Sequence, residues 1–211
     1  LSKTSTQQMV LFALILGRLL PVVVMAPFLG GKNAPESVKM GLAVLMALLA
    51  FPIVAASSSV PPPTTPVAFL VMMLKEVFIG FCIGFVLLEL FLIADMLGRL
   101  VDLLRGTNMA TALVPELKER SSVFGNMSYQ LFLVIFLSIG GHRYFLGALF
   151  TSFAAIPVTE MPQFASAGMG AFAELIMVSA ARIIMVAVAL AMPILVAVFL
   201  TDLTFGLLNR T

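Results

Sequence analysis

The sequence from Ala94 to Ser128 reads ADMLGRLVDLLRGTNMATALVPELKERSSVFGNMS and interrupts a chain that is otherwise strongly apolar. Eight of the 22 charged residues, 12 basic and 10 acidic in all, lie between Asp95 and Arg120. The first four, Asp95, Arg99, Asp102 and Arg105, are separated by three or four residues. Opposite charges at this spacing share one face of a helix and can pair along it. The spacing therefore predicts a helix that carries a ladder of charges.

The segment after this helix reads GTNMATA from Gly106 to Ala112 and predicts a loop, because glycine and threonine are poor helix formers. Pro115 then disfavours helical backbone at Val114. We place this central polar loop at about residues 105–122. A charge in the middle of a bilayer costs about 2.5–3.5 kcal/mol, and irregular backbone is tolerated there only against protein or a water-filled cavity. The stretch is therefore either a solvated loop between two spans or the lining of a watery path.

Composition places the chain among membrane proteins. Of its 211 residues 61% are apolar and only 10% are charged, and the mean hydropathy is +1.14. Soluble domains contain roughly 25% charged residues. A net charge of +2 gives no indication of nucleic-acid binding. We expect an integral membrane protein, or one that assembles like one.

The sequence contains no recognisable catalytic or metal-binding motif. It has one cysteine and one histidine, so a Cys/His cluster that could hold zinc cannot form. His142 follows two glycines and is predicted to be a turn residue. We therefore predict that the protein is not an enzyme and uses no cofactor.

Apolar runs broken by proline and glycine predict an all-α fold of hydrophobic helical hairpins, which we treat as one domain over residues 1–211. Ser37 is a candidate cap for the second helix. Val67 to Leu104 can form one helix of about 57 Å, nearly twice the thickness of a bilayer core. Pro193 predicts a bend in the last run. The expected helical runs are Val10–Phe28, Val38–Ala56, Val67–Leu104, Tyr129–Ile139, Tyr144–Ala155 and Gly170–Leu200.

A few polar residues and glycines lie inside these runs. Gly80 and Gly84 form a GxxxG motif, which lets another backbone approach closely. Lys75 and Glu76 precede it by one turn. Arg18 is predicted to pair with a neighbour or to reach toward the membrane surface rather than to bind a ligand. Glu89 lies in an apolar stretch and needs a partner.

Several of these residues, taken in order, resemble one family. The most specific segments are Arg105-Gly106, Ala110 to Pro115 and Ser121 to Asn126. Supporting matches are Lys75-Glu76, Gly80, Gly84, Pro27 followed by Lys39 and Pro52, Gly140-Gly141-His142, Ala191 to Pro193, Asp202 and Arg210. This pattern resembles the T subunit of the type III secretion export gate (SctT, SpaR and YscT), sister to the flagellar FliR proteins. Arg105-Gly106 and Gly141-His142 are more similar to the injectisome members than to the flagellar ones.

The resemblance implies a non-enzymatic structural and gating subunit of a helical, multi-subunit gate. In that family one T subunit joins R and S subunits, with U and V export subunits as further partners. The gate belongs to the bacterial inner membrane and projects in part to the periplasmic side. Its lumen conducts unfolded substrate proteins, and membrane lipid surrounds part of it.

The resemblance also assigns roles to residues of this chain. The loop that helps to keep the lumen closed corresponds to about Arg105 to Ser122. We expect the plug to consist of Arg105, Gly106, Thr107, Asn108, Met109, Ala110, Thr111 and Ala112. The side chains expected to serve the charge ladder and assembly are Asp95, Arg99, Asp102, Lys75, Glu76 and Glu89. Gly80 and Gly84 are expected to mediate close helix packing.

This chain departs from the family pattern in two places. Val114 stands where an acidic or polar residue often precedes the proline, which affects the polarity of the loop tip. The family usually continues beyond Arg210, so we expect that a C-terminal segment is missing.

Two other classes of function remain as alternatives. A secondary transporter of a small solute often shows repeated halves, and no clear repeat is visible. An intramembrane enzyme would need a nucleophile–base pair or a metal set.

Overall fold

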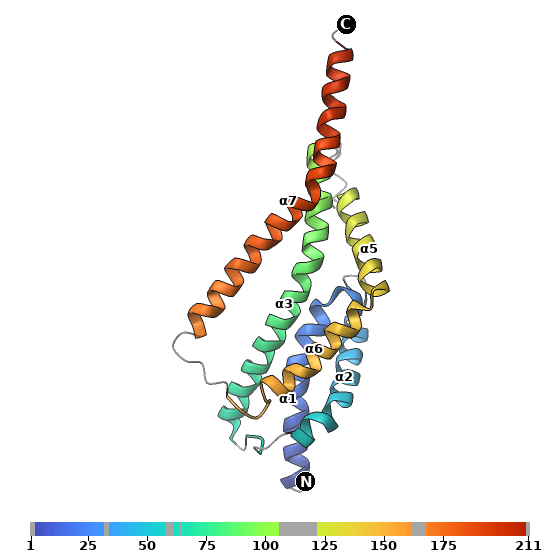
Figure 1. Ribbon diagram of the computed structural model, residues 1–211. Helices are drawn as coiled ribbons and strands as arrows, with labels where there is room; N and C mark the ends of the chain where they lie inside the picture. The colour runs from blue at the N-terminus through green and yellow to red at the C-terminus, as the bar shows by residue number, and fades with distance from the viewer. Residues whose placement is uncertain are drawn as a thin grey trace, which may run out of the picture. The chain divides into compact units, whose positions relative to one another are not determined.

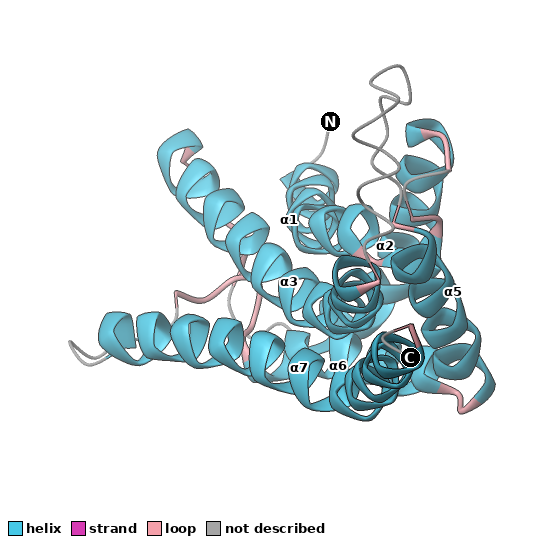
Figure 2. Cartoon of the chain, turned by 90° about the horizontal axis from the view of Figure 1, so that it is seen from above, coloured by secondary structure: helices cyan, strands magenta, loops and turns pink. Residues whose placement is uncertain are grey.

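The computed structural model describes residues 3–31, 34–57, 61–63, 65–105, 122–161 and 168–209. Within these ranges every regular element is a helix, and loops join them (Figures 1 and 2). This confirms the predicted all-α fold class. The elements are α1 (Lys3–Met25), the 3-10 helix η1 (Pro27–Leu29), α2 (Glu36–Ser57), α3 (Pro66–Leu104), α5 (Val123–Ser138), α6 (Gly141–Ala155) and α7 (Gly168–Leu208).

Four of the described helical segments are long and apolar enough to cross a membrane. They are Ser5–Met25, Glu36–Ala56, Pro66–Leu104 and Met177–Leu208. The single long helix expected before the polar loop is present as α3, with 39 residues. It measures about 58 Å at 1.5 Å per residue. α7 is longer still, with 41 residues, so both helices exceed the thickness of a bilayer core of about 30 Å.

Three local expectations need correction or refinement. α2 begins at Glu36, because the carbonyl of Pro35 already accepts the N–H groups of Val38 and Lys39 at 3.0 and 3.3 Å. Ser37 therefore lies inside the first turn and is not the cap. His142 lies in the first turn of α6 rather than in a turn, because Gly140 supplies the left-handed residue (φ 77°) before it.

α7 extends beyond the predicted run at both ends and contains Pro193. Proline removes one backbone hydrogen bond from a helix and bends it. Figure 1 shows the ribbon of α7 changing direction partway along its length.

The described chain divides into two compact units. The first contains residues 1–88 and 136–168, and the second contains residues 89–135 and 169–211. α3 contributes its first part to one unit and its last part to the other. The expectation of a single domain stays a prediction.

The core of the first unit lies mainly between α1 and α2. α1 contributes large aliphatic side chains that are fully buried, such as Leu14 and Leu19. α2 meets them with small ones, because Ala43, Ala47 and Ala50 recur at helical spacing on its buried face. Leu149 and Phe153 of α6 complete this core. Pairing large side chains with alanine lets the two helices pack closely.

The second unit contains a close contact between α3 and α5. The ring of Phe91 on α3 lies 5.8 Å from that of Tyr129 and 5.2 Å from that of Phe132. Nearer the end of α3, a Cβ atom added to Gly98 would overlap the backbone of Phe124. The lack of a side chain at Gly98 is therefore what allows α5 to start so close to α3.

Candidate functional site

Asp102 joins the end of α3 to the beginning of α5. This aspartate is 1% exposed. Its Oδ2 atom accepts a hydrogen bond from the hydroxyl of Ser122 and another from the backbone N–H of Phe124, the latter at 3.1 Å. The carboxylate therefore binds the first turn of α5 from the last turn of α3.

Ser122 caps α5. Its hydroxyl oxygen accepts the N–H of Gly125 at 2.8 Å, which is the hydrogen bond that an N-terminal serine cap makes. A carboxylate beside the first turn of a helix is also stabilised by the positive end of the helix dipole. Cap and carboxylate thus act on the same helix end. We call Gly98, Asp102, Ser122, Phe124 and Gly125 the α3–α5 clamp.

Arg105 extends the same contact. Its guanidinium carbon lies 5.0 Å from the centroid of the Phe124 ring, within the range of a cation–π interaction. The rest of the predicted plug, Gly106 to Ala112, lies outside the described residues. Of the two described ends of the polar loop, Ser122 belongs to the clamp and Arg105 contacts its Phe124.

The charge ladder predicted along α3 forms at its first step. Nε of Arg99 lies 2.7 Å from Oδ2 of Asp95, and 58% of the Arg99 side chain is exposed. An exposed pair at this spacing contributes only about 0.3–0.5 kcal/mol. Asp102 and Arg105, the next members of the ladder, contact α5 as described above. Their use in assembly stays a prediction.

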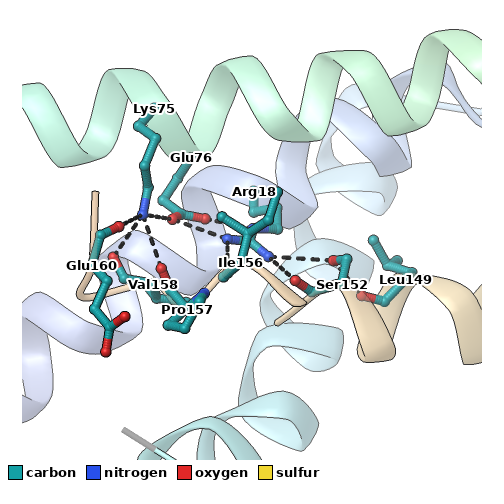
Figure 3. Close-up of polar contacts among 9 residues, drawn as sticks. All are labelled: Arg18, Lys75, Glu76, Leu149, Ser152, Ile156, Pro157, Val158 and Glu160. Carbon is teal, nitrogen blue, oxygen red and sulfur yellow. Dashed lines mark hydrogen bonds and ion pairs between the residues drawn. The ribbon is translucent and has the colours of Figure 1, made fainter. Parts of the chain in front are cut away.

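A second polar site lies inside the first unit, where α1, α3 and α6 meet (Figure 3). Arg18 and Glu76 have fully buried side chains. Nε of Arg18 lies 2.5 Å from Oε2 of Glu76, and Nη2 lies 3.1 Å from Oε1. Such a two-point contact between guanidinium and carboxylate is among the stronger polar interactions in proteins. Of the two alternatives predicted for Arg18, pairing with a neighbour and reaching toward the membrane surface, the structure shows the first.

The same arginine binds the carboxyl end of α6. It donates to the carbonyl oxygens of Ser152 at 2.9 Å and of Ile156 at 2.8 Å. The last carbonyls of a helix lack partners within the helix and carry partial negative charge. Arg18 therefore adds donors at this helix end beyond the N–H of Ile156, which the Ser152 carbonyl also accepts at 3.0 Å.

Lys75 completes the cluster. Its Nζ atom lies 2.8 Å from Oε1 of Glu76. It also donates to the carbonyl oxygens of Pro157, Val158 and Glu160 at 3.0, 3.0 and 2.8 Å. Two cations thus share one carboxylate, and the end of α6 and the residues after it supply the other acceptors (Figure 3). We call Arg18, Lys75 and Glu76 the buried charge cluster.

Sequence reasoning found these three charged residues but not what they bind. From the sequence, Lys75 and Glu76 are expected to serve assembly with other subunits. In the structure they pair with each other, and Lys75 also donates to the carbonyl of Pro157 within the first unit. Backbone carbonyls leave no signal in a sequence, so the contacts with α6 could not be predicted. Glu89 is 9% exposed, and its Oε1 atom has no hydrogen-bond partner among the described residues.

The packing glycines of α3 face α1. A Cβ atom at Gly80 would overlap the carbonyl oxygen of Arg18. One at Gly84 would lie 3.1 Å from Met25. A close backbone approach between α1 and α3 is therefore made beside the buried charge cluster.

The family follows from a comparison with known proteins. Residues 9–211 match the family described as bacterial export proteins, family 1. The chain belongs to this family. This confirms the resemblance inferred from the sequence motifs.

The chain is similar to proteins of both secretion and flagellar systems. The chain is 26% identical to flagellar biosynthetic protein FliR of Bacillus subtilis (strain 168) over 200 residues, which cover 95% of this chain and 75% of that protein. It is 31% identical to Yop proteins translocation protein T of Yersinia pestis over 207 residues, 94% of this chain and 75% of that protein. It is 32% identical to secretion system apparatus protein SsaT of Salmonella typhimurium over 136 residues, 64% of this chain and 51% of that protein.

Proposed function

We propose that this chain is a structural and gating subunit of a protein export apparatus of the type III secretion class. It belongs to a family of export proteins, and its relatives carry the names of secretion and flagellar proteins. Its long apolar helices fit a place in the bacterial inner membrane. In this proposal it joins R and S subunits, contacts U and V export subunits, and helps to form a conduit for unfolded proteins that projects in part to the periplasmic side.

The α3–α5 clamp is the observation that carries the gating role. Residues 106–121 connect Arg105, just after α3, to Ser122, the cap of α5. Because Asp102 binds both Ser122 and Phe124, the two ends of this connection are held at one place. A segment anchored in this way can change its conformation without separating the helices that carry it. That property suits a plug that closes a conduit and yields to a substrate.

The mechanism is steric. Glycine at position 106 allows backbone conformations that other residues avoid. The residues that follow, Thr107 to Ala112, are mostly small, and Met109 is the one large side chain among them. Substrate displaces the loop, and the clamp returns it to the same position.

Deleting Gly106 to Ala112 tests this role in cells that carry the complete secretion system. We expect ions or small molecules to leak across the inner membrane while the export apparatus still assembles, because the clamp residues remain. The measurements are membrane leak, substrate secretion, and co-purification of this subunit with the apparatus.

A replacement of Gly106 to Ala112 by a glycine–serine sequence of equal length is the matched control. It keeps the length of the connection and changes only its side chains, so we expect less leak than in the deletion. A tight membrane and normal secretion in the deletion variant would show that the loop is only a connector.

The transporter alternative loses its support, because the family is one of protein export rather than of small-solute transport. The enzyme alternative gains none, because the similar proteins carry the names of export and secretion proteins.

A further inference from the structure

Asp202 on α7 is an isolated charge on a long apolar surface. It is the only charged residue between Ile183 and Asn209. Its side chain is exposed, and no described residue forms an ion pair with it. A carboxylate that faced lipid here would be strongly unfavourable, so a position in this environment needs a partner or water.

Asp202 lies in a groove of the second unit. The groove has a volume of about 310 Å³. Apart from Asp202 its lining is entirely apolar, and it comes from the end of α3 and from α7. The lining residues are Leu104, Leu195, Val196, Val198, Phe199 and Asp202.

The apolar surface continues beyond the groove toward the end of α7. Phe199 is 64% exposed and Phe205 is 62% exposed. The apolar segment Met177–Leu208 has 32 residues and measures about 48 Å as a helix. A bilayer core of about 30 Å cannot cover all of it. Part of this apolar surface therefore extends beyond the bilayer core, and the exposed side chains past Asp202 include Leu203 and Phe205.

We propose that this groove binds an apolar helix that carries one lysine or arginine and belongs to another subunit of the export apparatus. The apolar lining would receive the hydrophobic face of that helix, and its cation would pair with Asp202. Apolar helices commonly bind in such grooves. A charge pair shielded from water fixes the register of two helices and excludes wrong partners. This inference rests on the proposed function, because the partner is an export subunit.

Substitutions at Asp202 test the docking site in cells that express the whole apparatus. Asp202→Lys places a second cation against the expected one, and Asp202→Asn removes the charge without changing the shape. We expect co-purification of this subunit with the apparatus, extracted in a mild detergent, to fall about tenfold or more for Asp202→Lys and severalfold for Asp202→Asn.

Glu174 provides the matched control, because it is an exposed carboxylate on the same helix and does not line the groove. Glu174→Lys and Glu174→Asn should co-purify like the parent protein. Parental co-purification of both Asp202 variants would overturn the proposal.

A photo-crosslinking residue at position 199 gives a result that does not depend on the folding of a charge variant. The expected product of Phe199→benzoylphenylalanine is an adduct with another export subunit. An adduct with lipid alone, or no protein adduct, would overturn the proposal, since it would mean that the membrane or water covers the groove.

Failure of the docking site can be told apart from failure of the proposed function. If the parent chain co-purifies with export subunits and crosslinks elsewhere, only the docking site is wrong. If the parent chain co-purifies with no export subunit, the proposed function itself is wrong.

Discussion

Asp95 and Asp102 lie on the same helix and have the same charge, but their surroundings differ. Asp95 pairs with Arg99 one turn away, at a position where the arginine is largely exposed. Asp102 is buried and holds the start of a different helix. The hydrogen bonds of Asp102 are partly buried and involve a charged group, so water replaces them less readily than it replaces those of an exposed pair.

We therefore expect Asp102→Ala to destabilise the protein by about 1.5–3 kcal/mol, the usual contribution of hydrogen bonds to a charged group. Asp95→Ala should cost well under 1 kcal/mol, as is usual for exposed ion pairs. The measurement is thermal unfolding of the purified protein in detergent. Equal losses in the two variants would mean that the clamp contributes no more than the surface pair.

The contact between α1 and α3 depends on glycine at particular positions. Gly80 meets the backbone of α1, which cannot move aside as a flexible side chain can. Gly41 on α2 has open space where its side chain would be. Substitution by alanine is therefore expected to change the stability of the protein in opposite directions at these two helical glycines.

Gly80→Ala should destabilise the protein by about 1–3 kcal/mol, as overpacking of a close contact does. Gly41→Ala should stabilise it by up to about 1 kcal/mol, because alanine is the better helix former. Thermal unfolding of both variants measures the difference. If Gly80→Ala were as stable as Gly41→Ala, the two helices would not be in close contact at this point.

Much of the fold could be predicted at the scale of single helices. Apolar runs and their proline or glycine breaks indicate the helices, and GxxxG indicates where one backbone approaches another. The site was harder, because its partners are distant in sequence. Asp102 has charged neighbours at helical spacing, which favoured a ladder along α3, yet its described partners are Ser122 and Phe124 on the other side of the loop.

In the first unit, one carboxylate joins three helices. Glu76 of α3 binds Arg18 of α1 and adjoins Lys75, and these two cations hold the carboxyl end of α6 and the residues after it. The side chains alone carry one more positive than negative charge. The carbonyl oxygens around them compensate for part of this excess, so the cluster depends on all three helices being in place.

Glu76→Gln should therefore affect the whole unit. It preserves the shape of the side chain and leaves two buried cations without a carboxylate, and breaking a buried ion pair in this way costs about 3–5 kcal/mol. We expect the unfolding temperature to fall by roughly 6 °C or more. Glu174→Gln, which changes an exposed carboxylate on α7, is the control. Similar melting of the Glu76→Gln variant and the parent protein would contradict the role of the cluster.

The position of Gly80 has a consequence for the evolution of this protein. Its backbone neighbour is the carbonyl of Arg18, and the side chain of Arg18 binds Glu76, one turn before Gly80 on α3. A larger residue at position 80 would shift the backbone that carries Arg18. Loss of either charge would remove the ion pair that the close approach of the two helices allows. Positions 18, 76 and 80 should therefore be inherited as a set. Natural variants should keep all three residues or replace all three. Chains that replace only one or two of them should be selected against.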